Sequence, residues 1–174
     1  MYFHSVNEGF IEIPKANASL NIYTVGCEHH CDGCQAKDLQ NINHKDRRVL
    51  TSKLIIDSIN RSKGFLDGIC WLGGDPFFQF ADCYHISKDI KKELPNILNV
   101  VFTGYTFLDF YKNINIKAKQ DIENNMKEKN NIFDYIIDGK WNGHKLGDIE
   151  CNQKVYQATI NGFKEINYKE YCEK

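Results

Sequence analysis

Short apolar runs alternate with longer amphipathic segments along most of this chain, and the two patterns predict different elements. Residues 20–25 (LNIYTV) and 68–74 (GICWLGG) have the length and apolar content of short buried strands. Residues 97–104 (ILNVVFTG) and 133–139 (FDYIIDG) repeat this pattern. We therefore predict four buried strands, preceded by a shorter alternating segment that is interrupted at Pro14.

The amphipathic segments between these strands predict helices. In residues 51–64 the apolar positions share one helical face, and Thr51 or Ser52 can cap the N-terminus. Residues 80–95 place apolar side chains three or four positions apart, and this segment ends at a proline. Residues 113–131 are polar almost throughout, which favours a solvated helix with irregular ends.

Strands that alternate with helices in this way are typical of a parallel sheet with right-handed crossovers. A closed barrel of eight such units needs about 250 residues, whereas this chain has 174 residues. We expect an α/β fold with one open, curved and mostly parallel sheet, to which residues 155–166 add a last strand. No repeat and no linker divides the chain, so residues 1–174 should form one domain.

Each predicted strand ends in a glycine next to a polar or reactive residue. The carboxyl ends of parallel strands form the edge at which α/β proteins bind their ligands. We therefore expect four short groups to meet on one rim of the sheet: Gly26-Cys27, Gly73-Gly74-Asp75, Thr103-Gly104 and Asp138-Gly139.

Composition and charge narrow the class of protein. The formal net charge is −1, with 22 basic and 23 acidic side chains, which gives no reason to expect a nucleic acid or a membrane surface as a partner. No secretory signal and no apolar run of about 20 residues is visible, so we expect a cytoplasmic protein. Its seven cysteines should then stay reduced, and Cys70 and Cys83 fall in apolar patterns that suit core positions.

Three cysteines are the first candidate for chemistry, because Cys27, Cys31 and Cys34 follow the spacing C-x₃-C-x₂-C. Closely spaced thiolates are typical of iron–sulfur clusters, and three of them leave one iron without a protein ligand. The alternative is a structural zinc site with the same three cysteines and either His29 or His30. Zinc sites usually combine two separated ligand pairs, and no second pair is visible, so the spacing favours the cluster.

A second candidate lies in the sequence WLGGDPF, residues 71–77, at the end of a predicted strand. Two glycines let the backbone approach a ligand closely, and Asp75 can accept hydrogen bonds from an ammonium group. The same residues could also form an ordinary turn into a helix. Next to a loop of three cysteines, they favour a ligand with an amino-acid end that binds at the open iron.

These motifs resemble those of the radical S-adenosylmethionine (SAM) superfamily. Within it, the chain resembles the activating enzymes of anaerobic, class III ribonucleotide reductases. The matching segments occur in the family's order: VGCEHHCDGC, LGGDPF, FTGYTF, IIDGKW and, more weakly, NQ. The resemblance covers a core of residues 20–153, with residues 1–19 as an N-terminal extension, and it implies a partial, open (β/α) barrel.

The resemblance also implies which residues bind the cofactors. The ligands of a [4Fe-4S] cluster would be Cys27, Cys31 and Cys34, and SAM would bind the fourth iron. The amino group of SAM would meet the strand-end motif, which consists of Gly73, Gly74 and Asp75, with Pro76 shaping the turn. The remaining assignments place Gly33 and Gln35 at the adenosyl part, and Thr103, Gly104 and Asp138 in the same pocket. These last three could equally be turn residues at strand ends.

The implied reaction begins when an external donor such as a flavodoxin reduces the cluster. SAM is then cleaved, and its 5′-deoxyadenosyl radical removes hydrogen from a glycine of a large reductase subunit. Two features depart from the family: Glu150-Cys151 replaces a Gly-Ser pair, and a polar insert follows Asn113. Two other hypotheses are another small radical SAM enzyme, with a different glycyl-radical partner or a small-molecule substrate, and a zinc-binding interaction module.

Overall fold

One eight-stranded sheet organises the computed structural model, which describes residues 1–9 and 15–173. The first half of the alternating segment around Pro14 lies outside these residues. The strands are β1 (Tyr2–Gly9), β2 (Ser19–Thr24), β3 (Arg48–Val49), β4 (Gly68–Gly73), β5 (Leu98–Phe102), β6 (Tyr135–Asp138), β7 (Lys154–Thr159) and β8 (Gly162–Ile166). The helices are α1 (Ser52–Arg61), α2 (Phe80–Glu93), α3 (Phe107–Asn113), α4 (Ile116–Lys127) and α5 (Tyr168–Cys172), with short 3₁₀ helices η1 (Lys37–Gln40) and η2 (Pro76–Gln79).

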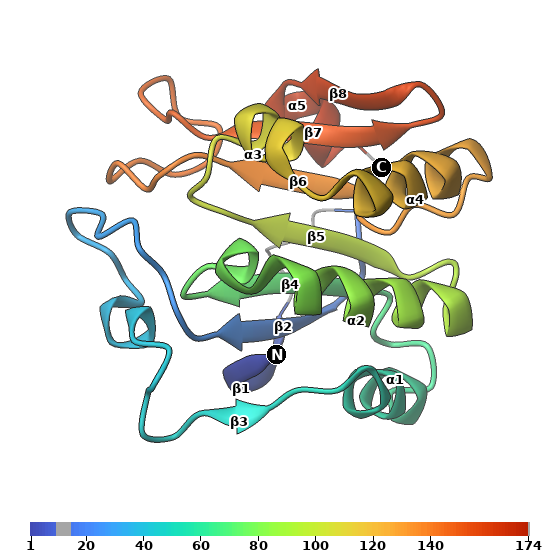
Figure 1. Cartoon of the computed structure of the whole chain (residues 1–174), viewed down its shortest axis with the longest axis horizontal. Helices are drawn as coiled ribbons and strands as arrows, with labels where there is room; N and C mark the ends of the chain where they lie inside the picture. The colour runs from blue at the N-terminus through green and yellow to red at the C-terminus, as the bar shows by residue number, and fades with distance from the viewer. Residues whose placement is uncertain (10–14, 174) are drawn as a thin grey trace.

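The sheet is mixed, which corrects the expectation of a mostly parallel sheet. Its strand order is β3-β1-β2-β4-β5-β6-β7-β8, and only the central four strands, β2, β4, β5 and β6, pair in parallel. On both sides the added strands are antiparallel: β1 pairs with β2 and β3, and β7 pairs with β6 and β8. The sheet is open, as expected, with β3 and β8 at its edges (Figure 1).

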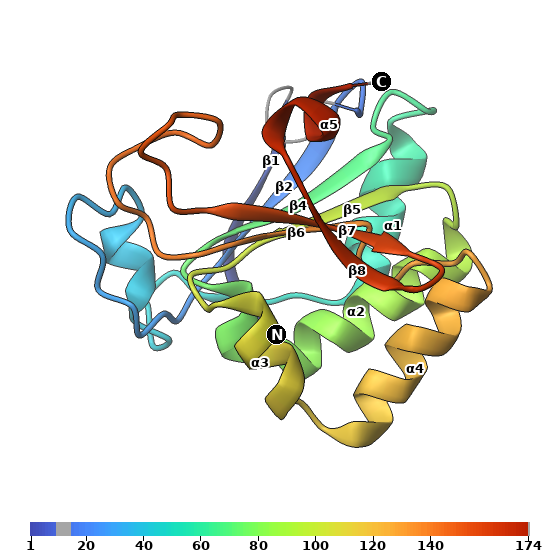
Figure 2. The same cartoon turned by 90° about the horizontal axis from the view of Figure 1, so that it is seen from above.

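The two faces of the sheet are covered differently, as Figure 2 shows. Helices α1 to α4 lie on one face, where Trp71 and Ile136 belong to the larger apolar core. On the other face, Cys70 and Ile137 belong to a smaller core that includes Tyr171 of α5. Neighbouring residues of one strand enter different cores because side chains alternate between the faces of a sheet.

Most of the predicted elements are confirmed with small shifts of their ends. Helix α1 has the predicted cap, since the Thr51 hydroxyl accepts a hydrogen bond from the Leu54 N–H group at 3.4 Å. Cys70 and Cys83 are fully buried, and all seven cysteines are free. The polar segment forms α4, which nevertheless buries Ile122 and Met126.

Several elements differ from the prediction. Strand β1 lies within the segment that we treated as an extension, and it pairs with both β2 and β3. Helix α3 was not predicted. The tail forms a hairpin of β7 and β8 rather than one strand, because Gly162 adopts a φ of +116° and the chain turns just before it.

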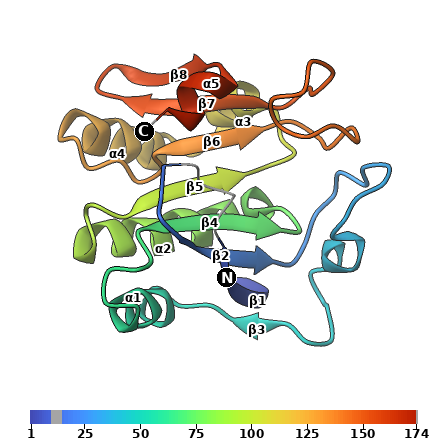
Figure 3. The ribbon, with the colours of Figure 1, turned by 180° about the vertical axis from the view of Figure 1, so that it is seen from behind.

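The parallel strands bring their carboxyl ends to one edge of the sheet. Figure 3 shows two long connections extending beyond this edge: the loop after β2 and the loop after β6. We call residues 25–40 the cysteine loop and residues 139–153 the second loop. Within the described residues, no helix is long and apolar enough to cross a membrane.

Candidate functional site

The cysteine loop is attached to the sheet where β2 ends. Gly26 has a φ of +92°, and a Cβ atom there would lie 2.6 Å from the Phe78 ring, so the position requires glycine. The Gly26 N–H group donates to the Leu39 carbonyl at 2.8 Å, and Cys27 N–H donates to the Gln40 carbonyl at 3.0 Å. These bonds make η1 fold back on the start of the loop and close it.

Cys27, Cys31 and Cys34 are all partly exposed and form no disulfide. The Cys34 N–H group donates to the Cys31 carbonyl at 3.3 Å, which turns the chain between them. The His29 N–H group donates to Cys27 Sγ at 3.5 Å. Burial raises the pKa of the Cys27 thiol. A bound iron would favour the thiolate by supplying a nearby positive charge.

A cavity of about 690 Å³ lies between the cysteine loop, the strand ends and the second loop. Pockets for small molecules and cofactors span roughly 300–1,000 Å³, so this one can hold a cluster together with an organic ligand. Nine of the twelve predicted site residues line it: Cys27, Cys31, Cys34, Gln35, Gly73, Gly74, Asp75, Thr103 and Gly104.

The structure places the other three predicted residues outside this lining. Gly33 is exposed, with a φ of +67°, in the turn between two of the cysteines. Pro76 is buried at the first position of η2. Asp138 is buried too, and its carboxylate accepts a hydrogen bond from the Phe107 N–H group at 2.7 Å, at the start of α3. Burial raises the pKa of the Asp138 carboxyl.

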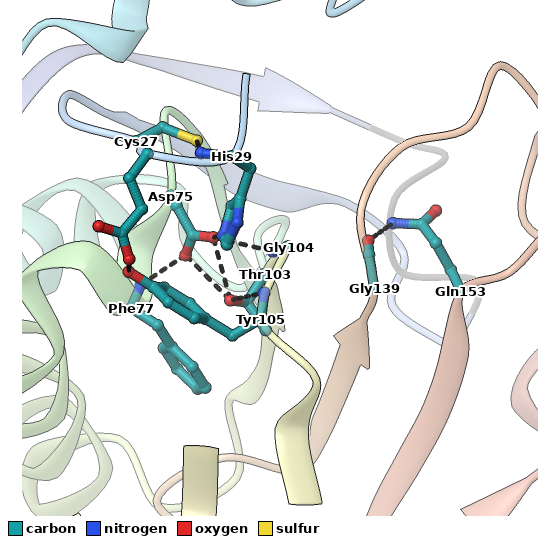
Figure 4. Close-up of polar contacts among 10 residues, drawn as sticks. Cys27, His29, Asp75, Phe77, Thr103, Gly104, Tyr105, Gly139 and Gln153 are labelled. Atoms are coloured by element: carbon teal, nitrogen blue, oxygen red, sulfur yellow. Dashed lines mark hydrogen bonds and ion pairs between the residues drawn. The ribbon is translucent and has the colours of Figure 1, made fainter. Parts of the chain in front are cut away.

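Asp75 forms the centre of the hydrogen-bond network drawn in Figure 4. Its buried carboxylate accepts bonds from Phe77 N–H at 2.8 Å and from Gly104 N–H at 2.8 Å. It also accepts from the Thr103 hydroxyl at 3.0 Å and from His29 Nε2 at 2.7 Å. A carboxylate has about four acceptor positions. Groups of the protein therefore already fill the acceptor positions of Asp75, the side chain that we expected to bind the amino group of a ligand.

Positions 73 and 74 require glycine because the end of β4 lies very close to the end of β2. A Cβ atom at Gly73 would lie 2.5 Å from the Thr24 nitrogen, and one at Gly74 would lie 2.5 Å from the Gly26 oxygen. The backbone bonds across this junction are short, with Asp75 N–H donating to the Gly26 carbonyl at 2.7 Å. The glycine pair therefore holds the cysteine loop against β4, besides lining the cavity.

Sequence reasoning missed part of the cavity wall, which includes Leu72, Phe102, Trp141, Lys145, Leu146 and Gln153. Trp141 and Gln153 stand in segments that carried the resemblance, IIDGKW and NQ, and could have been found there. Leu72 and Phe102 follow from strand alternation, since both pack against the smaller core. Lys145 and Leu146 lie in the second loop, where no pattern indicated a site.

A second cavity, of about 830 Å³, lies beside the first and shares His29, Gly104 and Gly139 with it. Its lining is polar on several sides, with Glu28, Asp138 and other charged residues. The two cavities therefore meet along a wall that His29 helps to form.

The zinc alternative is not assembled in the described part of the chain. At this site the side chains that lie within single-ion distance are Cys27, His29 and Asp75, with ligand atoms within 4.8 Å of one another, and neither Cys31 nor Cys34 belongs to this set. His29 Nε2 is already bonded to Asp75, and the exposed His30 bonds to Gln40 Oε1 at 3.2 Å. A Cys₃His zinc site needs all four donors around one ion at about 2.0–2.3 Å.

The donor set suits an iron–sulfur cluster instead. Three free thiols on one loop, at the ligand-binding edge of an α/β sheet, can hold three irons of a [4Fe-4S] cluster and leave the fourth open. Fold and site together define an α/β protein with a cluster-binding loop.

Comparison with known families agrees with this class. The family described as a 4Fe-4S single cluster domain matches residues 18–157, which is most of the chain and includes every residue that lines the first cavity. The chain therefore belongs to this family. No curated protein matches it.

Proposed function

We propose that this protein is a radical SAM activating enzyme that generates a glycyl radical on an anaerobic ribonucleotide reductase. One observation carries the proposal: the three cysteines and the glycine-rich end of β4 line one cavity with room for a ligand beside the cluster. A cluster that only transfers electrons needs no such neighbouring space. A cluster with an open iron beside a pocket for an organic molecule suits a reaction with that molecule.

In this proposal Cys27, Cys31 and Cys34 hold the cluster, and the cavity binds SAM. When bound, the cluster supplies the electron that cleaves SAM to methionine and a 5′-deoxyadenosyl radical. The protein orients SAM and excludes water from the radical. The partial exposure of the cysteine loop would let an external donor, such as a flavodoxin, approach the cluster.

The residues that line the cavity can make apolar contacts with one part of SAM and polar contacts with another. Phe102 and Trp141 both line the cavity and offer aromatic surface for the adenine ring. The amino-acid end of SAM would meet the main chain at Gly73 and Gly74. The Asp75 carboxylate is engaged within the protein, so we assign it to holding this strand end rather than to direct contact with the amino group.

The second cavity supports a macromolecular substrate. It shares a wall with the first cavity, and it is large and polar enough for a peptide segment. A glycine presented where the two cavities meet would lie next to the 5′-deoxyadenosyl radical, which would take a hydrogen atom from its Cα and become 5′-deoxyadenosine. The partner would thus be a large glycyl-radical reductase subunit whose glycine loop enters there.

The test is anaerobic incubation of the reconstituted protein with dithionite, SAM and a candidate reductase, followed by electron paramagnetic resonance. We expect a doublet glycyl signal that disappears when any component is omitted. SAM cleavage without any radical on glycyl-radical partners would contradict the activase role and favour a radical SAM enzyme with a small-molecule substrate. Stoichiometric zinc in a colourless protein would contradict the whole proposal.

A further inference from the structure

The spacer between the first two cysteines contains Glu28, His29 and His30, and these side chains have different environments. The His29 side chain is 7% exposed, and its Nε2 atom donates to Asp75 Oδ2 at 2.7 Å. Its ring also meets the Tyr105 ring edge to face, with centroids 4.5 Å apart. His29 is therefore packed into the protein, although it lies in an otherwise partly exposed loop.

The residues around His29 form a cradle that fits this side chain. A Cβ atom at Gly104 would overlap the His29 ring, so glycine at this position is what lets the ring approach β5. Thr103 and the Gly104 N–H group both donate to Asp75, which fixes the carboxylate that His29 binds. Three residues that we had placed in a SAM pocket thus serve His29 in this structure.

A second contact attaches the same spacer to the same strand end. The Tyr105 hydroxyl donates to Glu28 Oε1 at 2.6 Å, while its ring packs on His29. His30, in contrast, has a φ of +49° and an exposed hydrogen bond to Gln40. Two consecutive residues of the spacer therefore connect the cysteine loop to the ends of β4 and β5.

We propose that His29 is a positioning residue for the cluster, which it serves by fixing the first cysteine of the loop against the sheet. Its side chain binds the Asp75 cradle, and its N–H group donates to Cys27 Sγ at 3.5 Å. Residues that orient metal ligands without binding the metal commonly change metal affinity 10–100-fold when they are replaced. The proposal rests on the cluster site and is independent of SAM and of any partner.

The energetic reason lies in the burial of Asp75, which is 1% exposed. Removing the His29 donor leaves a buried carboxylate with one acceptor position unfilled, and such a group is costly to keep out of water. The loop would relieve this by moving, and Cys27 would move with it. Loss of the N–H···S bond would also make the reduced cluster less stable, because hydrogen bonds to the sulfurs help to set the potential.

The experiment compares His29→Phe, His29→Gln and a matched control in the same spacer, His30→Asn. Asparagine tolerates the positive φ of position 30. Each protein is reconstituted anaerobically without SAM, and iron release to an excess of chelator is followed by absorbance. We expect release from His29→Phe to be at least about tenfold faster than from the wild type. His29→Gln keeps a donor for Asp75 and should recover part of this loss, and His30→Asn should match the wild type.

A second readout is the midpoint potential of the cluster, measured by an anaerobic redox titration. We expect a more negative value for His29→Phe and an unchanged one for His30→Asn. If His29→Phe does not fold as an apoprotein, Gly104→Ala provides the same test, since its methyl group displaces the His29 ring and leaves the donor in place.

Asp75→Asn separates positioning from direct ligand binding. If the role of Asp75 is to hold the His29 side chain in place, this variant loses iron faster than the wild type even without SAM. Wild-type iron retention and potential in His29→Phe and Asp75→Asn, together with weaker SAM binding, would overturn the proposal and return Asp75 to the SAM pocket. A wild-type protein that never holds iron would contradict the cluster site itself, which is a different failure.

Discussion

The two loops that enclose the first cavity are built in different ways. The cysteine loop is tied to the sheet through Gly26, Cys27 and His29, which bond to η1 and to the end of β4. The second loop bonds mainly within itself: Asn142 Nδ2 donates to the Glu150 carbonyl at 2.7 Å. Ile149 at its tip is fully exposed.

This difference matches what each loop has to do. Cluster ligands must be held to within a fraction of an ångström, which favours a loop fixed by many contacts. A wall that closes over an organic ligand can be less constrained and can adjust when the ligand binds. We therefore interpret the cysteine loop as the preorganised side of the site and the second loop as the adaptable side.

The largest expected difference between the loops appears when one cysteine of each is replaced in turn, because only the cysteine loop should lose its cluster. Cys31→Ala removes a proposed cluster ligand, so we expect no stable cluster after anaerobic reconstitution, judged by iron, sulfide and visible absorbance. Cys151→Ala changes a partly exposed cysteine of the second loop that does not line the cavity, and should reconstitute like the wild type. A normal cluster in Cys31→Ala would refute the ligand assignment.

A smaller effect on stability and iron retention should distinguish an alanine substitution next to the cysteine loop from one in the second loop. A methyl group at Gly74 would meet backbone atoms of Gly26 and Leu39 at 2.5–2.9 Å, so the cysteine loop must shift. We expect Gly74→Ala to lower the free energy of unfolding by about 1–3 kcal/mol and to weaken iron retention.

Gly143→Ala is the control for this change. Gly143 has a φ of +92° but open space around its Cα, so the cost is confined to backbone conformation in an exposed turn. We expect little change in iron retention. Equal loss of iron in Gly143→Ala and Gly74→Ala, by the same chelator assay, would remove the contrast between the loops.

Replacing Trp141 tests the adaptable wall by itself. Trp141→Ala should leave iron content and absorbance unchanged, because the residue belongs to the second loop. The Kd for SAM, measured by anaerobic titration, should rise about tenfold, which corresponds to the loss of one aromatic contact of about 1.4 kcal/mol. Wild-type SAM affinity would show that this wall does not contact the ligand.

The smallest effect is expected at Asp138, directly before the second loop. Burial raises the pKa of its carboxyl in the folded state. Stability from this group is therefore present below the unfolded pKa of about 3.9 and is lost as the pH rises through the folded pKa. Asp138→Asn lacks this dependence, so its stability relative to the wild type should improve from pH 4 to pH 8. Denaturant unfolding across that range checks the trend, and a constant difference would contradict it.

The sequence predicted the central strands well and the flanking ones poorly, for a physical reason. Buried parallel strands such as β4 are apolar on both faces and end in glycines, which leaves a strong pattern. Strand β1 has Phe3 as its one buried residue, and its alternation is weak. Helix α3 is too short for a clear apolar period, and it depends on a distant cap from Asp138 that no local pattern reveals.

The site was predictable as a set of residues but not as a set of roles. The residues at the ends of the predicted strands were correctly expected on one rim of the sheet, because parallel strands share their carboxyl edge. That Asp75 faces His29 rather than an open pocket depends on side-chain geometry between segments 46 residues apart. The same holds for Gly104, whose purpose appears only when the His29 ring is in place.

Reductive cleavage of SAM is the most direct test of the central claim that the cysteine loop and its cavity form a radical SAM site. The measurement is 5′-deoxyadenosine released by the anaerobically reconstituted protein with dithionite and SAM. We predict that it forms with the wild type and is absent with Cys31→Ala. A protein that holds a complete cluster and binds SAM, yet releases no 5′-deoxyadenosine, would contradict the account.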